Sequence, residues 1–265
     1  MLFTLEHLIL QKRLQKPITK RLTTTSANSR AINMLIQGNC LKIIPELGQF
    51  DCLFADPPDN IGLNYQGYRD ERADYRSFLW DCFNLFVRHA GISWVSFNSK
   101  WSFMVGSLVE RLLTRFPEID AKIFIVSYTF GQHNNKDCGD GYRPLLRLKH
   151  KKMPLYPDQI KVPSQRQIIG DKRAKPGGCV PLDHWEFPKV TGNSYQRRSW
   201  HPTQLNEGII ERAVLLSTKE GGTVLDVFSG TGTTIRVCKR LKREVTSIEI
   251  SPYYCERIRN EHGNS

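Results

Sequence analysis

The chain has 265 residues, 40% of them hydrophobic and 24% charged, and its 38 lysines and arginines against 26 acidic residues give a net charge of +12. This composition is typical of a soluble globular protein, and no apolar run approaches the roughly 20 residues that a membrane-spanning helix needs. The seven cysteines form no C-x-x-C pair. We therefore expect neither a disulfide framework nor a metal site, and a reducing, cytoplasmic location.

The positive charge is concentrated in two segments of the chain. Residues 1–30 carry six basic and one acidic side chain, a net +5, and residues 131–201 carry fourteen and six, a net +8. Such a local field is typical of a polyanion binder, most often of nucleic acid, although a merely basic protein is the alternative. Residues 1–33 are expected to form a basic tail, which is also compatible with organelle targeting.

From residue 34 onward the sequence alternates between strand and helix patterns, which predicts β–α–β units in a doubly wound, Rossmann-like α/β sheet. Residues 131–200 lose this periodicity and are rich in Gly, Pro, Lys and Arg, so they are expected to be an inserted functional segment. The predicted strands are 34–39, 51–56, 92–98, 121–130, 223–228 and 244–250, and the predicted helices are 73–90, 100–116, 201–217, 231–241 and 252–262.

The sequence Asp56-Pro57-Pro58-Asp59 follows the apolar strand FDCLFA. Two prolines continue neither a strand nor a helix, so the chain turns stiffly with Asp56 at the carboxyl end of the strand. In open α/β sheets, ligands bind at this edge. The alternative is an ordinary strand-ending turn with a solvated aspartate.

A second motif, DVFSGTGTT at 226–234, joins a strand to the start of a helix. Gly230 and Gly232 permit a close backbone approach to a ligand, and the helix start offers free N–H groups. A dinucleotide fingerprint would have a third glycine where Ile235 stands. Glu249, at the end of the next strand, can accept both hydroxyls of an adenosine ribose, or it can cap the helix at Ser251-Pro252.

Together these motifs resemble the beta class of DNA amino-methyltransferases, which modify adenine N6 or cytosine N4. That family has an Asp-Pro-Pro-aromatic or Ser-Pro-Pro-aromatic motif and a later Phe-x-Gly-x-Gly loop for S-adenosylmethionine, which match DPPD at 56–59 and FSGTG at 228–232. WHPTQLNEGIIER (200–212) and QGNCLKIIPEL (37–47) are similar to its helix motif and to its segment ahead of the catalytic strand, where Asn39 replaces the usual Asp. The resemblance covers roughly 34–130 and 200–260.

The resemblance implies that S-adenosylmethionine is the cofactor, DNA the substrate and Asp56, Pro57, Pro58 and Asp59 the catalytic motif. Asp56 and the Pro57 carbonyl would accept hydrogen bonds from the target amine. Asp-Pro-Pro favours adenine N6, with cytosine N4 as the alternative and a catalytically impaired DNA-binding module as the alternative of another class. The implied cofactor-binding residues are Asn39, Cys40, Asp56, Thr203, Gln204, Asp226, Phe228, Ser229, Gly230, Thr231, Gly232, Thr233 and Glu249.

The chain departs from the family at the fourth motif position, where Asp59 stands in place of an aromatic side chain that stacks on the extruded base. A carboxylate has no π face, so Tyr65 and Tyr68 in the following loop are the candidates for stacking. An alternative is that Asp59 hydrogen-bonds the base edge.

The basic segment resembles the family's target-recognition region. The expected organisation is a basic tail at 1–33, a catalytic half at 34–130, a target-recognition insertion at 131–200 and a cofactor-binding half at 201–265. A homodimer and a cognate restriction endonuclease are possible further partners within a restriction-modification system. Trp185, Tyr195 and Trp200 are candidates for contacts with bases, and the expected DNA-binding residues are Arg143, Lys151, Lys152, Arg166, Lys172, Arg173, Arg197 and Arg198.

Overall fold

The computed structural model describes residues 34–66, 68–128 and 135–263. The predicted basic tail at 1–33 lies outside them. No helix within the described ranges is long and apolar enough to cross a membrane.

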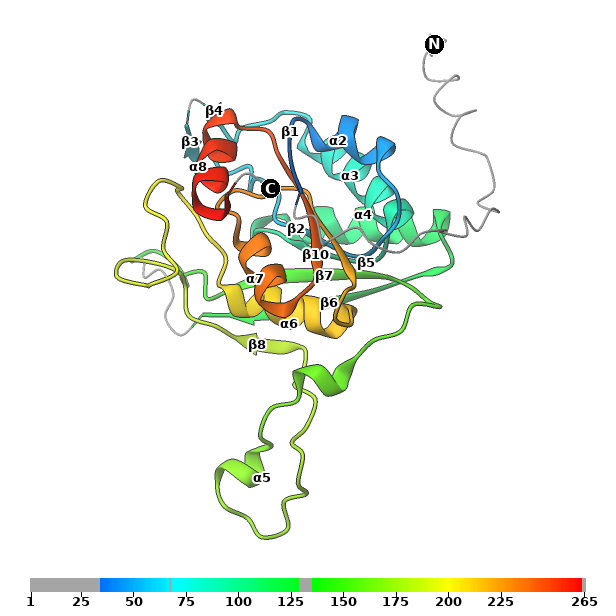
Figure 1. The fold of residues 1–265 in the computed structure, drawn as a ribbon, viewed down its shortest axis with the longest axis vertical. Coiled ribbons are helices and arrows are strands. Elements are labelled where there is room, and N and C mark those ends of the chain that lie inside the picture. Colours follow the sequence, from blue (N-terminus) through cyan, green and yellow to red (C-terminus); the bar gives the residue numbers. More distant parts are fainter. Residues whose placement is uncertain (1–33, 67, 129–134, 264–265) are drawn as a thin grey trace. The chain divides into compact units, whose positions relative to one another are not determined.

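The described chain is built on an eight-stranded mixed sheet (Figure 1) with the strand order β1-β10-β9-β2-β5-β7-β6-β8. Five neighbouring strands of the sheet run parallel to one another, in the order β1, β10, β9, β2 and β5. Strand β7 is antiparallel to both of its neighbours, β5 and β6. The strands are β1 (Met34–Gln37), β2 (Phe50–Ala55), β5 (Ala90–Ser96), β6 (Ile119–Ser127), β7 (Tyr142–His150), β8 (His184–Glu186), β9 (Thr223–Asp226) and β10 (Glu244–Glu249).

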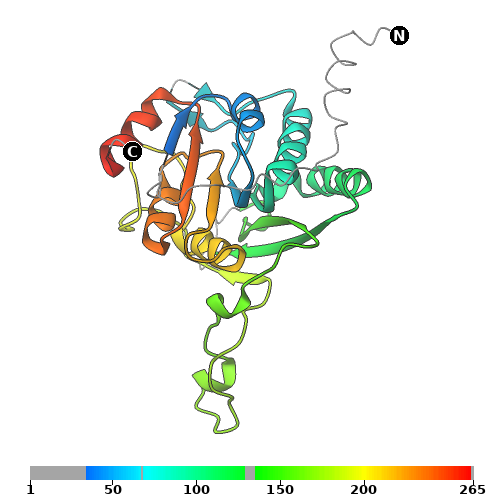
Figure 2. The ribbon, with the colours of Figure 1, turned by 45° about the vertical axis from the view of Figure 1, so that its right-hand side comes forward.

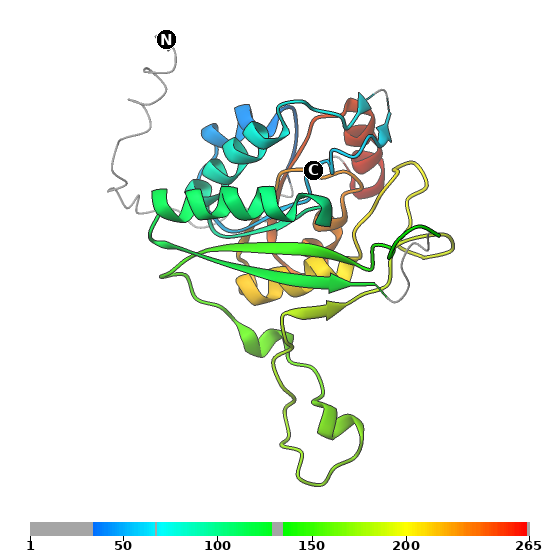
Figure 3. The same ribbon diagram turned by 180° about the vertical axis from the view of Figure 1, so that it is seen from behind.

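Helices cover both faces of this sheet (Figures 2 and 3), so its central strands are apolar without alternation. In β2, Leu53 and Ala55 pack under α3 and α4, while Cys52 and Phe54 pack on the opposite face with α6 and α7. The helices are α2 (Cys40–Ile43), α3 (Tyr75–His89), α4 (Ser102–Arg115), α5 (Gln165–Ile168), α6 (Glu207–Ser217), α7 (Thr233–Leu241) and α8 (Pro252–His262), with 3₁₀ turns η1 (Ile44–Glu46), η2 (Ser99–Trp101) and η3 (Pro157–Ile160) and a separate hairpin of β3 (Asn64–Tyr65) and β4 (Tyr68–Arg69).

The predicted doubly wound α/β fold is confirmed. Residues 131–200, in which we expected no regular strands, nevertheless contribute two strands to the sheet. Strand β7 lies inside the sheet and β8 lies at its edge. Trp185, which we expected to be available to bases, is 1% exposed and packs against Trp94 and Phe124 in the core. A short strand buried by partners distant in sequence carries little local periodicity, which explains the error.

The helix expected at 201–217 begins later, at Glu207. Asn206 is its N-cap, and the Asn206 side chain accepts a hydrogen bond from the backbone N–H of Gly208 at 2.9 Å. The cap marks the start of the helix, so residues 195–206, which we call the strap, form an irregular segment with turns ahead of it.

Residues 161–183, which we call the arm, extend away from the sheet between η3 and β8 and contain α5 (Figures 1 and 3). Paired backbone hydrogen bonds between Val162 and Cys179, of 2.9 and 2.8 Å, hold the two sides of the arm together near its base. Beyond this closure the arm forms a loop of its own.

Candidate active site

The two sequence motifs lie side by side because their strands are neighbours. Strands β2 and β9 are parallel, with Phe54 opposite Asp226, so Asp56 and the Gly-rich loop leave the same edge of the sheet. Glu249 ends β10, the strand on the other side of β9. These three strand ends surround a cavity of about 430 Å³, the strand-end cavity.

Nearly all the expected cofactor residues line this cavity, although they come from segments far apart in the sequence. Gly232 is the exception, since it starts helix α7 behind the loop. The remaining expected residues in the lining are Asn39, Cys40, Asp56, Thr203, Gln204, Asp226, Phe228, Ser229, Gly230, Thr231, Thr233 and Glu249.

The Gly-rich loop requires glycine at two positions. Gly230 and Gly232 have φ angles of +48° and +68°, in the left-handed region. A Cβ atom at Gly230 would lie 3.1 Å from Nε2 of His201 on the strap. Glycine thus lets the loop and the strap approach each other over the cavity.

Glu249 binds the start of α8, which is the alternative to ribose binding that the sequence offered, and it also binds the Gly-rich loop. Its Oε2 accepts the Gly230 N–H at 2.9 Å, and its Oε1 accepts the Ser251 N–H at 2.8 Å at the start of α8. Burial raises the pKa of this carboxyl. A carboxylate has about four lone-pair sites, so acceptor capacity toward the cavity remains.

Asp226 is the most deeply buried carboxyl of the cavity wall. Burial raises the pKa of Asp226 to about 7. Its Oδ1 accepts the Phe228 N–H at 3.3 Å, and its Oδ2 is buried without a hydrogen-bond partner among the described residues. An unsatisfied acceptor, a glycine cradle and Glu249 together fit a polar nucleoside ligand.

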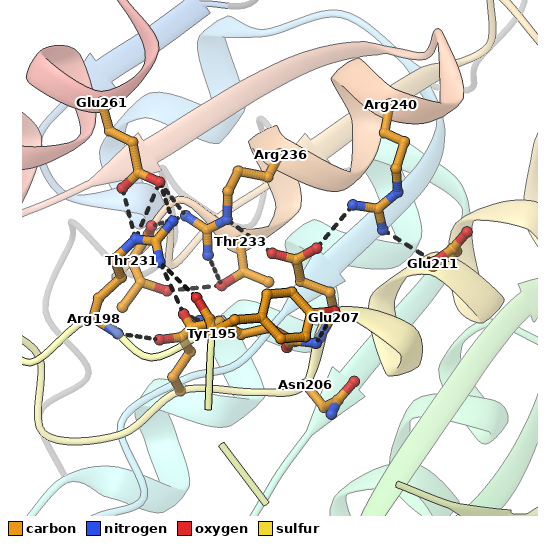
Figure 4. A network of polar contacts seen from close by, with 12 residues as sticks. Tyr195, Arg198, Asn206, Glu207, Glu211, Thr231, Thr233, Arg236, Arg240 and Glu261 are labelled. Atoms are coloured by element: carbon orange, nitrogen blue, oxygen red, sulfur yellow. Dashed lines mark hydrogen bonds and ion pairs between the residues drawn. The ribbon is translucent and has the colours of Figure 1, made fainter. Parts of the chain in front are cut away.

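An ionic network fixes the strap and the Gly-rich loop (Figure 4). Arg236 of α7 donates to Oε1 of Glu207 at 3.0 Å and to the Thr231 carbonyl at 2.8 Å. Arg198 of the strap pairs with Glu261 of α8, which also accepts from Arg236 at 3.3 Å. The strap is therefore held to α8 directly, and to α7 through the Glu261 carboxylate that Arg198 and Arg236 share.

Aromatic side chains form another part of the cavity lining. The Tyr65 ring lies 5.4 Å from that of His201, which lies 4.6 Å from Tyr254, and Tyr68 is 6.3 Å from Tyr65. Burial lowers the pKa of His201 to about 4, so this imidazole is neutral at pH 7. Tyr65 and Tyr68, the expected stacking residues, both line the cavity.

The carbonyl groups of the Asp-Pro-Pro-Asp motif are bound unequally. The Pro58 carbonyl accepts from the Tyr75 hydroxyl at 2.9 Å, and the Asp59 carbonyl accepts from Trp101 Nε1 at 2.6 Å. Within the described part of the chain no donor contacts the Pro57 carbonyl. The motif is thus anchored at the two carbonyls that directly follow Pro57, whose own carbonyl is the expected acceptor.

Arg143 lies in this site, which the sequence analysis missed when it placed the residue among DNA contacts. Its guanidinium pairs with Asp56 and Asp59 and donates to Ser96 Oγ. Because β7 runs antiparallel, its first residues reach the edge where the parallel strands end. Ser96, Tyr75, Trp101, His201 and Tyr254 were missed as well; the WHPTQ motif was the available signal only for His201.

The other expected DNA-binding residues divide into two groups. Arg197 and Arg198 bind within the strap and to α8, since Arg197 donates to the His201 carbonyl at 2.7 Å. The rest are exposed on the arm or on the turn after β7, and Arg173 pairs with Asp171 at 2.8 Å. These exposed residues are Lys151, Lys152, Arg166, Lys172 and Arg173.

Comparison with known proteins places this geometry in context. Residues 50–260 match the family model N6_N4_Mtase, described as DNA methylase. The type II methyltransferase M.HpaI of Haemophilus parainfluenzae is 30% identical over 84% of this chain and 71% of its own. DNA adenine methyltransferase YhdJ of Escherichia coli K12 is 27% identical over 83% of this chain and 79% of its own.

Solved structures share the fold at low sequence identity. The PvuII DNA methyltransferase, described as cytosine-N4-specific, superposes with a TM-score of 0.65 at 12% identity, over 87% of this chain and 86% of its own. The complex of M1.HpyAVI with S-adenosylmethionine superposes with a TM-score of 0.61 at 16% identity, over 87% of this chain and 99% of its own.

Proposed function

The chain belongs to the N6/N4 DNA methylase family, whose members are S-adenosylmethionine-dependent DNA amino-methyltransferases, and we propose that it methylates adenine N6. The observation that carries this proposal is the position of Asp56. It leaves the sheet edge beside Asp226 and Glu249 and lines the same cavity as the Gly-rich loop. A base amine held by Asp56 would therefore face a ligand seated on that loop.

S-adenosylmethionine, when bound, supplies the methyl group as an electrophile. An exocyclic amine is a weak nucleophile because its lone pair is delocalised into the ring. Asp56 and the Pro57 carbonyl accept hydrogen bonds from the two N–H groups of this amine. They thereby favour a tetrahedral nitrogen, whose lone pair can attack the methyl group. The flanking prolines and the bonds to Tyr75 and Trp101 fix these acceptors in advance, which is electrostatic preorganisation.

The residues that would bind the cofactor are those that line the strand-end cavity. Glu249 would accept hydrogen bonds from the ribose hydroxyls, and Asn39, Thr231 and Thr233 would offer further polar atoms around the ligand. The exocyclic amine is inaccessible in stacked DNA, so the target base is extruded into the site. Tyr65, with Tyr68 beside it, provides the aromatic face that Asp59 lacks.

Two observations favour adenine as the target. The motif is Asp-Pro-Pro, and the relative YhdJ is described as an adenine enzyme. Cytosine N4 is the second candidate, since the PvuII enzyme shares the fold. A DNA-binding module without turnover is the candidate of another class, because Asp59 replaces the usual aromatic residue.

The same relatives support a proposal about further partners. Several of them are type II methyltransferases, which supports a restriction-modification context with a cognate endonuclease. We further propose that the exposed basic residues of the arm contact DNA phosphates and that the enzyme acts as a homodimer.

The test is methyl transfer from labelled S-adenosylmethionine to mixed-sequence DNA, followed by nucleoside digestion and mass identification. N6-methyladenine that disappears in Asp56→Ala supports the proposal, and N4-methylcytosine would reassign the base. Tight binding of cofactor and DNA without any transfer would favour the non-catalytic module.

A further inference from the structure

A single arginine joins both aspartates of the Asp-Pro-Pro-Asp motif. Arg143 Nη2 lies 2.7 Å from Asp56 Oδ1 and 2.7 Å from Asp59 Oδ1, and Nη1 lies 2.9 Å from Asp59 Oδ2. The guanidinium therefore forms a two-bond fork on Asp59 and one bond to Asp56, while Nε donates to Ser96 Oγ. Forked Arg–carboxylate contacts are strong and fix the planes of both groups.

Arg143 and Asp59 each need the other as a partner, because both charged groups are largely buried. The side chains of Arg143 and Asp59 are 15% and 11% exposed, and a charge buried to this extent is costly without its partner. One guanidinium and one carboxylate cancel, so the three groups carry a net charge of −1. That is the charge that Asp56 alone would present to an amine.

We propose that Asp59 and Arg143 are coupled positioning residues that keep the Asp56 carboxylate ionised and aimed at the target amine. This inference rests on the proposed function. It explains the aspartate at the fourth motif position as half of an ion pair whose other half lies 84 residues later in the chain. Stacking on the base passes to Tyr65, which lines the cavity.

The electrostatic reason is the conflict between burial and charge at Asp56. Burial raises the pKa of Asp56, and the adjacent Arg143 opposes that increase. The other groups near the triad are Ser96 on β5, Tyr75 on α3, Tyr128 after β6 and Tyr65. Burial raises the pKa of all three tyrosines, so they stay neutral in the neutral and acid range, whereas the neighbouring Asp59 carboxylate adds to the rise in the pKa of Asp56.

The variants Arg143→Gln, Asp59→Asn and the double variant test this coupling. In Arg143→Gln two carboxylates share a buried site without their cation, so the pKa of Asp56 rises. As the pH is lowered, activity is then lost at a higher pH than in the wild type. We expect kcat/KM to fall about 100-fold at pH 7 and the acid limb of the pH profile to move up by roughly one to two pH units. Asp59→Asn in this background removes the second carboxylate and should recover about tenfold.

Arg147→Gln is the matched control. Arg147 points from the same strand but lies over the rings of Trp94 and Phe124, at 5.7 and 5.3 Å, away from the motif. It should leave the pH profile unchanged. Binding of S-adenosylmethionine, measured by calorimetry, should be retained in every variant and shows that the fold is intact.

A second readout does not depend on turnover. Carboxyl-carbon NMR of protein labelled at aspartate, assigned with Asp56→Asn, reports the pKa of Asp56 directly. A higher pKa of Asp56 in Arg143→Gln that is reversed in the double variant supports the pair, whether or not the wild type transfers a methyl group. A wild type that transfers no methyl group would contradict only the proposed function. An active wild type with the same Asp56 titration and pH profile in Arg143→Gln overturns the pair and leaves the proposed function standing.

Discussion

At the scale of single residues, the strand-end cavity is notable for buried carboxyl groups. Burial raises the pKa values of Asp56, Asp226 and Glu249, which lie at the ends of three adjacent strands. A carboxylate that stays ionised in such a site, as proposed for Asp56, produces a negative potential that favours a cationic ligand. The sulfonium of S-adenosylmethionine carries a positive charge of this kind.

Asp226 makes the stability of the free protein depend on pH. Its pKa is about 7 in the folded chain against an ordinary value of 3.8, so the folded state holds a proton that the unfolded state releases. The stabilisation is complete below about pH 4 and is lost as the pH rises through 7. We expect Asp226→Asn to remove this loss, which is on the order of 2–4 kcal/mol between pH 4 and 8.

Urea unfolding of the wild type and Asp226→Asn at a series of pH values measures this difference. Asp56 and Glu249 are present in both proteins, so the difference between the two curves reports Asp226 together with its interaction with Glu249. Asp140→Asn, at an exposed position, should run parallel to the wild type. Parallel curves for Asp226→Asn as well would show that this carboxyl is ionised in the folded protein.

At the scale of elements, the position of the strap depends on ion pairs between α6, α7 and α8. Glu207 is 11% exposed and accepts from Arg236 at 3.0 Å and from Arg240 at 2.8 Å. Arg236 in turn holds Thr231 and Thr233 of the Gly-rich loop. These contacts therefore connect α6, through Arg236, to the threonines that line the cavity.

Glu207→Gln should therefore lower both stability and affinity for S-adenosylmethionine. Removing one charge of a mostly buried pair is expected to cost about 2 kcal/mol of unfolding free energy. Glu211→Gln is the matched control, since its ion pair with Arg240 is largely exposed and should be worth about 0.5 kcal/mol or less. Thermal unfolding measures the stability of both variants, and calorimetry measures their affinity for S-adenosylmethionine. Equal losses in Glu207→Gln and Glu211→Gln would refute a special function of Glu207.

The arm is an element that can be removed without cutting the sheet, because Val162 and Cys179 are already paired. Replacing 164–178 by a short Gly-Ser linker removes Arg166, Lys172, Arg173 and Lys175 and one acid, Asp171, a net +3. We expect unchanged cofactor binding, weaker DNA binding, and a plot of log affinity against log salt that is less steep by up to about 3.

Filter binding of duplex DNA between low and moderate salt measures that slope. A variant with the four basic residues changed to Gln separates charge from shape. Unchanged affinity and slope in both variants would place DNA elsewhere on the protein.

At the scale of the whole molecule, the strand-end cavity joins the two ends of the described chain. Its lining includes residues 38–40 and Asp56 from the first part, and residues of the strap, the Gly-rich loop and the start of α8 from the last. A ligand that binds only the folded chain stabilises it by mass action, by about 2.7 kcal/mol at one hundred times its Kd.

We therefore expect saturating S-adenosylmethionine to raise the melting temperature by roughly 5–10 °C. Differential scanning fluorimetry measures the shift, and Glu249→Gln should reduce it at the same ligand concentration. A melting temperature that is insensitive to millimolar cofactor would contradict the assignment of this cavity.

The sequence by itself determined the features that are encoded locally. Asp56 after an apolar strand, and Gly230 and Gly232 before a helix, were predictable because chain stiffness and glycine freedom act within a few residues. The order of the longer strands and helices outside residues 131–200 was predictable for the same reason, whereas α2 and the β3–β4 hairpin were not predicted.

Only the tertiary structure decided which distant residues meet. Arg143 reaches Asp56 and Asp59 because β7 inserts antiparallel beside β5, and no local pattern encodes that pairing. Trp185 joins the core because β8 pairs with β6. Contacts across long sequence separations depend on the packing of the whole sheet, so the ion pair that gives Asp59 its partner becomes visible only after the chain has folded.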